Sequence, residues 1–165
     1  MRSYGTRMRS YRWSSIRTHT ARMTETEDEM YAEPVRVLVV DDEPAICRAL
    51  TIALTRAGFE VVAAQSGDAA LSVLSSQHVD VMVIDLRIPD TRGDVVFELA
   101  AATQPHLRHQ TLFMTGDISE RAYKLILSCK CPSIRKPFEL KELIGAVETL
   151  VPHRGRARDA RGQSA

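Results

Sequence analysis

The sequence predicts one α/β domain in which helices cover both faces of a parallel β-sheet. Short, mostly apolar runs alternate with longer stretches of helical periodicity across residues 35–151. Strict alternation of strands and helices is the pattern of a doubly wound parallel sheet. The run from Val81 to Ile84 is apolar throughout, which indicates a central strand that is buried on both sides.

Two strands and two helices are expected in the first half of this region. The strands cover residues 35–40 and 59–64. Between them, Pro44 fits the first turn of a helix, where its missing N–H costs no hydrogen bond, and Gly58 ends that helix. Ser66 is expected to cap the second helix with its hydroxyl.

Three strands and three helices are expected in the second half. They are a strand at 81–84 ending at Asp85, a helix at 93–103, a strand at 111–115, a helix at 117–129, a strand at 132–136 and a helix at 140–151. The last helix is the most clearly amphipathic, and we expect Leu140, Leu143 and Val147 to face the core rather than a partner.

The resulting (βα)5 order fits a flavodoxin-like, doubly wound sheet with strand order 2-1-3-4-5. A small Rossmann-like domain is the alternative architecture. That fold requires a glycine-rich turn after the first strand, whereas Asp41, Asp42 and Glu43 make this turn acidic.

Charged residues are distributed unevenly along the chain. Residues 1–22 carry six arginines and no acidic residue, residues 23–33 carry five acidic residues and no base, and residues 152–165 carry four arginines and one aspartate. We expect a disordered leader up to residue 34 and a basic disordered tail after the folded domain. Met23 is a plausible native start, and the composition before it also resembles a transit peptide.

Neither membrane insertion nor disulfide bonding is indicated. No apolar run approaches the ~20 residues that span a bilayer. Cys47, Cys129 and Cys131 form an odd set without a C-x-x-C pair, which favours a reducing compartment. We therefore expect a soluble, cytoplasmic protein.

Reactive side chains occur where the expected strands end. Asp41 and Asp42 follow the first strand, Asp85 follows the third, Thr115 ends the fourth and Lys136 ends the fifth. The carboxyl ends of parallel strands meet at one edge of the sheet, where ligands bind. Each residue alone is a weak signal, because acidic residues often begin helices, but the joint pattern predicts a site.

Three neighbouring carboxylates repel one another unless a cation lies among them. Mg²⁺ suits this role because it prefers oxygen ligands and retains several waters. With Mg²⁺ and the Lys136 ammonium beside it, an aspartate is well placed to attack phosphorus while the cations neutralise the phosphoryl oxygens. The Thr115 hydroxyl is placed to hydrogen-bond the transferred group.

Four segments, VLVVDDEPAI, VMVIDLRIPDTRGD, FMTGD and IRKPF, resemble the signature blocks of response-regulator receiver domains of two-component signalling. The resemblance covers about residues 35–151. It implies a phosphorelay protein that accepts a phosphoryl group on Asp85, with Mg²⁺, from a sensor histidine kinase or a histidine phosphotransfer protein. Such a domain catalyses only its own phosphorylation and dephosphorylation, and it signals to a downstream target through altered protein contacts.

The resemblance also implies a role for each matching residue. The residues that carry over are the Mg²⁺ ligands Asp41, Asp42, Asp85 and the Arg87 backbone carbonyl, the switch hydroxyl Thr115, the phosphoryl-binding Lys136 and a cis peptide bond before Pro137.

Two features depart from the family's pattern. The family usually has an aromatic switch residue three positions before the lysine, where this chain has Ser133. Arg87 replaces a common apolar residue two positions after the acceptor, and Asp117 lies two positions after Thr115. We expect Arg87 and Asp117 to pair across the mouth of the acceptor pocket and to tune the lifetime of the phosphoryl group.

Two other functions remain open. Ser133 favours a receiver-fold binding module that works without phosphorylation, although the complete set of site residues argues against it. A phosphohydrolase with an aspartyl-phosphate intermediate usually needs a second acid two positions after Asp85, where this chain has Arg87. The 14 residues after Val151 are too few for a helix-turn-helix domain, so we expect no DNA-binding domain.

Overall fold

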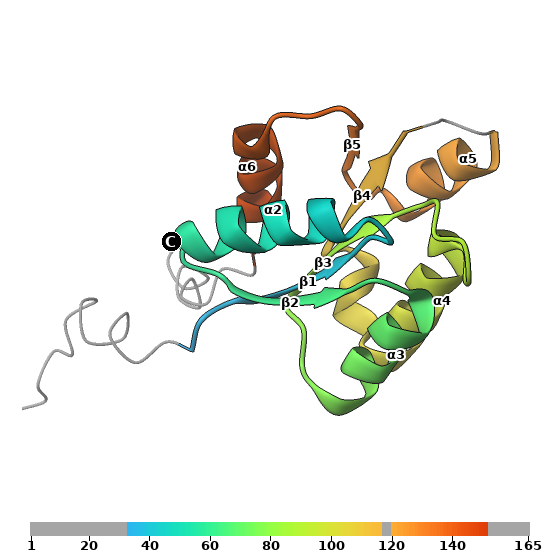
Figure 1. Ribbon diagram of the computed structural model, residues 1–165. Helices are drawn as coiled ribbons and strands as arrows, with labels where there is room; N and C mark the ends of the chain where they lie inside the picture. Colours follow the sequence, from blue (N-terminus) through green and yellow to red (C-terminus); the bar gives the residue numbers. More distant parts are fainter. Residues whose placement is uncertain (1–32, 117–119, 152–165) are drawn as a thin grey trace, which may run out of the picture. The chain divides into compact units, whose positions relative to one another are not determined.

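The computed structural model describes residues 33–116 and 120–151, and a five-stranded parallel sheet forms its centre (Figure 1). The strands are β1 (Arg36–Val40), β2 (Glu60–Ala64), β3 (Val81–Asp85), β4 (Thr111–Thr115) and β5 (Ser133–Arg135). Their order in the sheet is β2-β1-β3-β4-β5, which confirms the predicted flavodoxin-like order.

Helices alternate with these strands along the described ranges, as predicted. They are α2 (Pro44–Arg56), α3 (Gly67–Ser76), α4 (Gly93–Thr103), the 3-10 helix η1 (Pro105–Arg108), α5 (Glu120–Cys129) and α6 (Leu140–Leu150). Helices α2 and α6 cover one face of the sheet, and α3 and α4 cover the other (Figure 1). Leu125 and Ile126 of α5 pack with the α3 and α4 side.

Alternation along the strands divides the core into two layers. In β1, Val37 and Val39 pack with α2 and α6, whereas Leu38 and Val40 pack with α3 and α4. All five residues of β3 are buried, as predicted for a strand covered on both faces. The sheet is therefore fixed between two apolar layers, and its carboxyl edge is held at a defined place.

Local signals explain where the first helices begin and end. Pro44 is the first residue of α2, and that helix stops before Gly58, whose φ of +94° suits glycine alone. The Ser66 hydroxyl accepts a hydrogen bond of 3.1 Å from the Ala69 N–H, which confirms the predicted cap of α3.

The prediction for the apolar face of α6 was wrong at one position. Leu143 and Val147 are fully buried, but 43% of Leu140 is exposed. Leu140 is the first residue of α6, and helical side chains tilt toward the helix N-terminus. Its side chain is therefore not part of the core layer to which Leu143 and Val147 belong.

Other expectations fall at or beyond the limits of the described residues. Strand β5 is shorter than predicted, and α5 is described from Glu120, because the predicted start of this helix lies in the undescribed segment 117–119. The expected leader and tail also lie outside the described residues, apart from Glu33 and Pro34. None of the described helices combines the length and apolar composition that crossing a bilayer requires.

Candidate functional site

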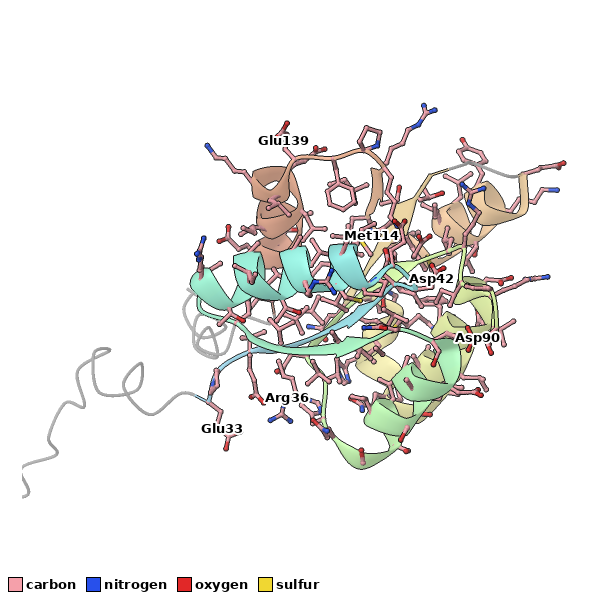
Figure 2. The ribbon with its side chains drawn as sticks, in the orientation of Figure 1. Glu33, Arg36, Asp42, Asp90, Met114 and Glu139 are labelled. Atoms are coloured by element: carbon pink, nitrogen blue, oxygen red, sulfur yellow. The ribbon has the colours of Figure 1, made fainter. Side chains whose placement is uncertain are left out.

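The order of the strands brings the acidic residues to one place. Strands β1 and β3 are neighbours with Val40 aligned to Ile84, so Asp41 and Asp85 occupy adjacent positions at the carboxyl edge. The Asp41 N–H donates to the Ala64 carbonyl at 3.1 Å, which keeps Asp41 in line with the sheet. Asp42 follows Asp41 just after the end of β1 (Figure 2).

The three aspartates form a donor set that fits a hard divalent cation. One carboxylate oxygen from each of Asp41, Asp42 and Asp85 lies within 4.8 Å of the other two. Asp41 is fully buried and Asp85 is 6% exposed, whereas Asp42 is more open, so solvent reaches one side of the group. Oxygen-only ligands with room for water are the coordination that Mg²⁺ prefers.

Lys136 places a positive charge inside this acidic group. Its Nζ lies 2.7 Å from Asp41 Oδ2 and 2.5 Å from Asp85 Oδ2, and 4.0 Å from Glu43 Oε1. Burial alone would lower the pKa of Lys136, but the hydrogen bonds to Asp41 and Asp85 outweigh it, and the pKa is raised. The ammonium is therefore charged at neutral pH. The peptide bond from Lys136 to Pro137 is cis.

Both oxygens of the Asp85 carboxylate are held. Oδ2 accepts from Lys136, and Oδ1 accepts the Arg87 N–H at 2.8 Å. The start of α4 lies tightly against the Asp85 backbone, since a Cβ on Gly93 would come within 2.3 Å of the Asp85 carbonyl oxygen. Glycine is therefore required at position 93 for this approach.

A backbone hydrogen bond connects Thr115, at the end of β4, to Lys136, which follows β5. Thr115 is 2% exposed at the end of β4, and its carbonyl accepts the Lys136 N–H at 2.8 Å. Arg135 pairs with Thr115 in the sheet, and Lys136 follows Arg135. Thr115 and Lys136 therefore lie at the same edge of the sheet as Asp85. The structure thus brings the predicted residues of strands β1, β3, β4 and β5 to a common edge.

The three expected modulators have different surroundings. Arg87 is exposed, and one of its guanidinium nitrogens would lie 3.1 Å from a Cβ on Gly116, so the group sits beside the end of β4. Asp117 lies outside the described residues, and its pairing with Arg87 stays a prediction. Ser133 is exposed at the start of β5.

One residue of the loop that follows Asp85 was not predicted to have a role. Asp90, in the loop after β3, accepts the Gly67 N–H at the start of α3, with an Oδ2 distance of 3.0 Å. The dipeptide Pro89-Asp90 marks a turn. Nothing in it indicates which backbone the carboxylate reaches, because Gly67 is distant in sequence.

A 2-1-3-4-5 sheet with an acidic carboxyl edge and a half-buried lysine is the arrangement of a receiver-type signalling domain. Comparison with known families agrees with this class. The family model for the response regulator receiver domain matches residues 37–148. The chain belongs to this family, which is a family of signalling modules in two-component systems rather than of classical enzymes.

Curated relatives and solved structures give the same result. The chain is 33% identical to the response regulator MprA of Mycolicibacterium vanbaalenii over 80% of this chain and 56% of that protein. It is 35% identical to the transcriptional regulatory protein KdpE of Mycobacterium tuberculosis over 70% of this chain and 50% of that protein. A CheY-like receiver domain protein from Methanospirillum hungatei superimposes with a TM-score of 0.67 at 25% identity, over 72% of this chain and 94% of that one. The chain thus spans about half the length of these curated relatives.

Proposed function

We propose that the protein is a phosphoacceptor response regulator that receives a phosphoryl group on Asp85 from the phosphohistidine of a sensor kinase or a phosphotransfer protein. One observation carries the proposal. Two buried carboxylates share one lysine ammonium, and a third carboxylate lies within 4.8 Å, at the edge where parallel strands end.

The transfer follows from the groups that surround Asp85. A carboxylate oxygen of Asp85 attacks phosphorus, a P–O bond forms, and the P–N bond of phosphohistidine breaks with its electron pair leaving on the imidazole nitrogen. The Lys136 ammonium, already bonded to Asp85, is placed to contact the negative phosphoryl oxygens. The Arg87 N–H fixes the carboxylate before the attack.

Asp41, Asp42 and Asp85, with the Arg87 backbone carbonyl, would hold Mg²⁺. When bound, the ion supplies positive charge to the oxygens of the transferring group. Without a cation, three carboxylates face one ammonium at this edge. The excess negative charge of these residues therefore favours the binding of a divalent cation.

Signalling then depends on how the other residues at the carboxyl edge of the sheet respond to the phosphoryl group. Thr115 supplies a hydroxyl to hold the new phosphoryl group, which biases a two-state equilibrium in the neighbouring strands and helices. A downstream protein reads that change. We place this relay in the cytoplasm, in a receiver that comprises residues 35–151.

Arg87 and Asp117 are proposed to set the lifetime of the phosphoryl group. The position of the Arg87 guanidinium beside Gly116 supports a role at the mouth of the pocket. Replacing Arg87 with alanine is expected to change the rate of dephosphorylation several-fold, measured after removal of the phosphodonor. An unchanged rate would overturn this role.

A second candidate is a receiver-fold module that binds its partner without phosphorylation. Ser133 favours it, because the side chain is exposed and small where the family usually has an aromatic residue. In that case, binding to the partner would be equal for wild type and for Asp85→Asn.

The proposed function is tested by incubating the protein with acetyl phosphate, with and without Mg²⁺, and separating the products on a phosphate-affinity gel. A shifted band that requires both Mg²⁺ and Asp85 is expected. Asp80→Asn is the matched control, because Asp80 is a buried aspartate at the opposite end of β3 and its variant should shift normally. A shift that persists in Asp85→Asn, or that needs no divalent cation, would contradict the proposal.

A further inference from the structure

The loop between β3 and α4 is attached to a helix that contributes no residue to the acidic site. In this loop, the Asp90 carboxylate accepts the Gly67 N–H through both oxygens, at 3.3 Å for Oδ1 and 3.0 Å for Oδ2. Gly67 is the first residue of α3, and Asp90 lies beside the start of that helix (Figure 2). The loop and the helix are thus joined at one defined backbone position.

Packing reinforces this attachment. A Cβ on Gly67 would come within 2.5 Å of Thr91 Cβ and 3.0 Å of Val96 Cγ2, so the chain after Asp90 lies directly against the backbone of α3. Leu86 and Ile88 of the same loop are buried in the core layer that α3 and α4 share. The β3–α4 loop is therefore held by the hydrogen bond of Asp90 to α3 and by the burial of Leu86 and Ile88 in the core.

The beginning of the same loop belongs to the acceptor site. The Arg87 N–H holds Asp85 Oδ1 at 2.8 Å, and the Gly93 N–H donates to the Leu86 carbonyl at 3.3 Å. Arg87 is also the residue whose backbone carbonyl is proposed as a metal ligand. A displacement of the loop at Asp90 would therefore reach this ligand and the acceptor carboxylate through a short covalent path.

We propose that Asp90 is a positioning residue for the acceptor site: by binding the first turn of α3, it holds the β3–α4 loop, and with it the Arg87 carbonyl and Asp85, in the geometry that receives the divalent cation. This inference rests on the proposed function. Asp90 itself is not a ligand, and it acts only through the loop.

The ionisation of Asp90 supports its hydrogen bond to the start of α3 at neutral pH. Desolvation alone would raise the pKa of Asp90, but hydrogen bonds from the backbone N–H groups of Thr91, Asp90, Asp68 and Gly67 outweigh it and lower the pKa. The positive end of the α3 dipole favours the same ionised form. The carboxylate is therefore charged, and able to accept these bonds, at neutral pH.

A simpler role for Asp90 would be to cap α3 and nothing more. The chain offers a matched control, because the Ser66 hydroxyl also accepts an N–H from the first turn of α3, at 3.1 Å from Ala69. Ser66 lies outside the β3–α4 loop. Ser66→Ala thus removes a cap from the same helix end without releasing the loop.

The test compares Asp90→Ala, Asp90→Asn and Ser66→Ala in the full chain. Mg²⁺ affinity is measured by calorimetry, and amide hydrogen exchange of residues 86–92 is measured in metal-free protein. Asp90→Ala is expected to weaken Mg²⁺ binding about tenfold and to speed exchange in the loop. Ser66→Ala should leave both unchanged, and Asp90→Asn, which keeps an acceptor oxygen, should stay within about twofold of wild type.

Two results would overturn the inference. If Asp90→Ala and Ser66→Ala affect Mg²⁺ affinity and loop exchange equally, Asp90 is only a helix cap. If wild type binds Mg²⁺ and Asp90→Ala binds it equally well, the positioning role is wrong while the proposed function stands. A wild-type protein without measurable Mg²⁺ affinity would instead overturn the proposed function, and this inference with it.

Discussion

The two ends of β3 both hold a buried aspartate, but the two aspartates have opposite surroundings. At the amino edge of the sheet, Asp80 Oδ2 accepts the Arg36 N–H at 2.8 Å, and Oδ1 lies 3.4 Å from His78 Nε2. The Arg36 side chain in turn donates to both oxygens of Glu60, at 2.9 and 3.0 Å. Donors and acceptors are matched at this edge.

The carboxyl edge also combines acidic and basic side chains, but without that balance. The carboxylates of Asp41 and Asp85 share the Lys136 ammonium, and a carboxylate oxygen of Asp42 lies within 4.8 Å of both. Figure 2 shows Arg36 and Asp42 at opposite ends of the sheet. Burial of an aspartate therefore does not by itself identify a functional site. The excess of negative charge over local partners does, because only that excess calls for a cation.

The largest expected effect concerns a thiol at the amino edge. Cys131 lies just before β5, and desolvation, together with its hydrogen bond to Cys129 and the charge of that neighbour, raises the pKa of its thiol to about 12. Alkylation of native protein at about pH 8 should be roughly a thousandfold slower at Cys131 than in the urea-unfolded chain. Mass spectrometry of labelled peptides measures it. Rapid labelling of Cys131 in the native protein would contradict the raised pKa of its thiol.

The second effect is steric and falls at the carboxyl edge. Gly93→Ala places a Cβ against the Asp85 carbonyl and the Leu86 Cα, so backbone must move. We expect the free energy of unfolding to fall by about 3 kcal/mol in urea denaturation. Gly145→Ala in α6 is the control, because no atom outside its own helix turn lies within 4 Å, and it should gain up to about 1 kcal/mol. Equal effects of the two variants would contradict the close approach at Gly93.

The third effect tests the charge balance directly. Asp80→Asn weakens a charge-assisted hydrogen bond in a matched group and should lower the free energy of unfolding by about 2 kcal/mol. Asp85→Asn removes one of three crowded negative charges in metal-free protein and should raise it by about 1 kcal/mol. Urea denaturation with a chelator present measures both. Loss of stability in both variants would remove the distinction between the two edges.

The smallest effect is a dependence on pH at Asp90. The folded-state pKa of this carboxyl lies below its usual value of 3.8, so its ionised form stabilises the fold above that value. This contribution is lost as the pH falls through the lowered pKa. The stability of wild type relative to Asp90→Asn should therefore shrink on acidification below about pH 4. The difference in stability between wild type and Ser66→Ala should stay constant over the same pH range, because both proteins keep Asp90 and the Ser66 hydroxyl does not titrate.

Periodicity and strand ends predicted most of the fold and the convergence of the acidic residues with Lys136. This succeeded because parallel strands must end at a common edge, so sequence position alone fixes which side chains meet. Contacts between loops and helices were not predictable in this way. The bond from Asp90 to Gly67 depends on how the β3–α4 loop folds back, which no local pattern encodes. The start of α6 was predicted, but the exposure of Leu140 was not, because periodicity assigns a residue to a helix face without accounting for the tilt of first-turn side chains.

We propose that Asp85, and no other aspartate, receives the phosphoryl group. The most direct measurement is to phosphorylate the protein with acetyl phosphate and Mg²⁺, reduce the acyl phosphate with borohydride, digest the chain and locate the modified residue by mass spectrometry. Reduction converts a phosphorylated aspartate to homoserine, and we expect this conversion at Asp85 alone. Conversion at Asp41, Asp42 or Asp80, with Asp85 intact, would contradict it.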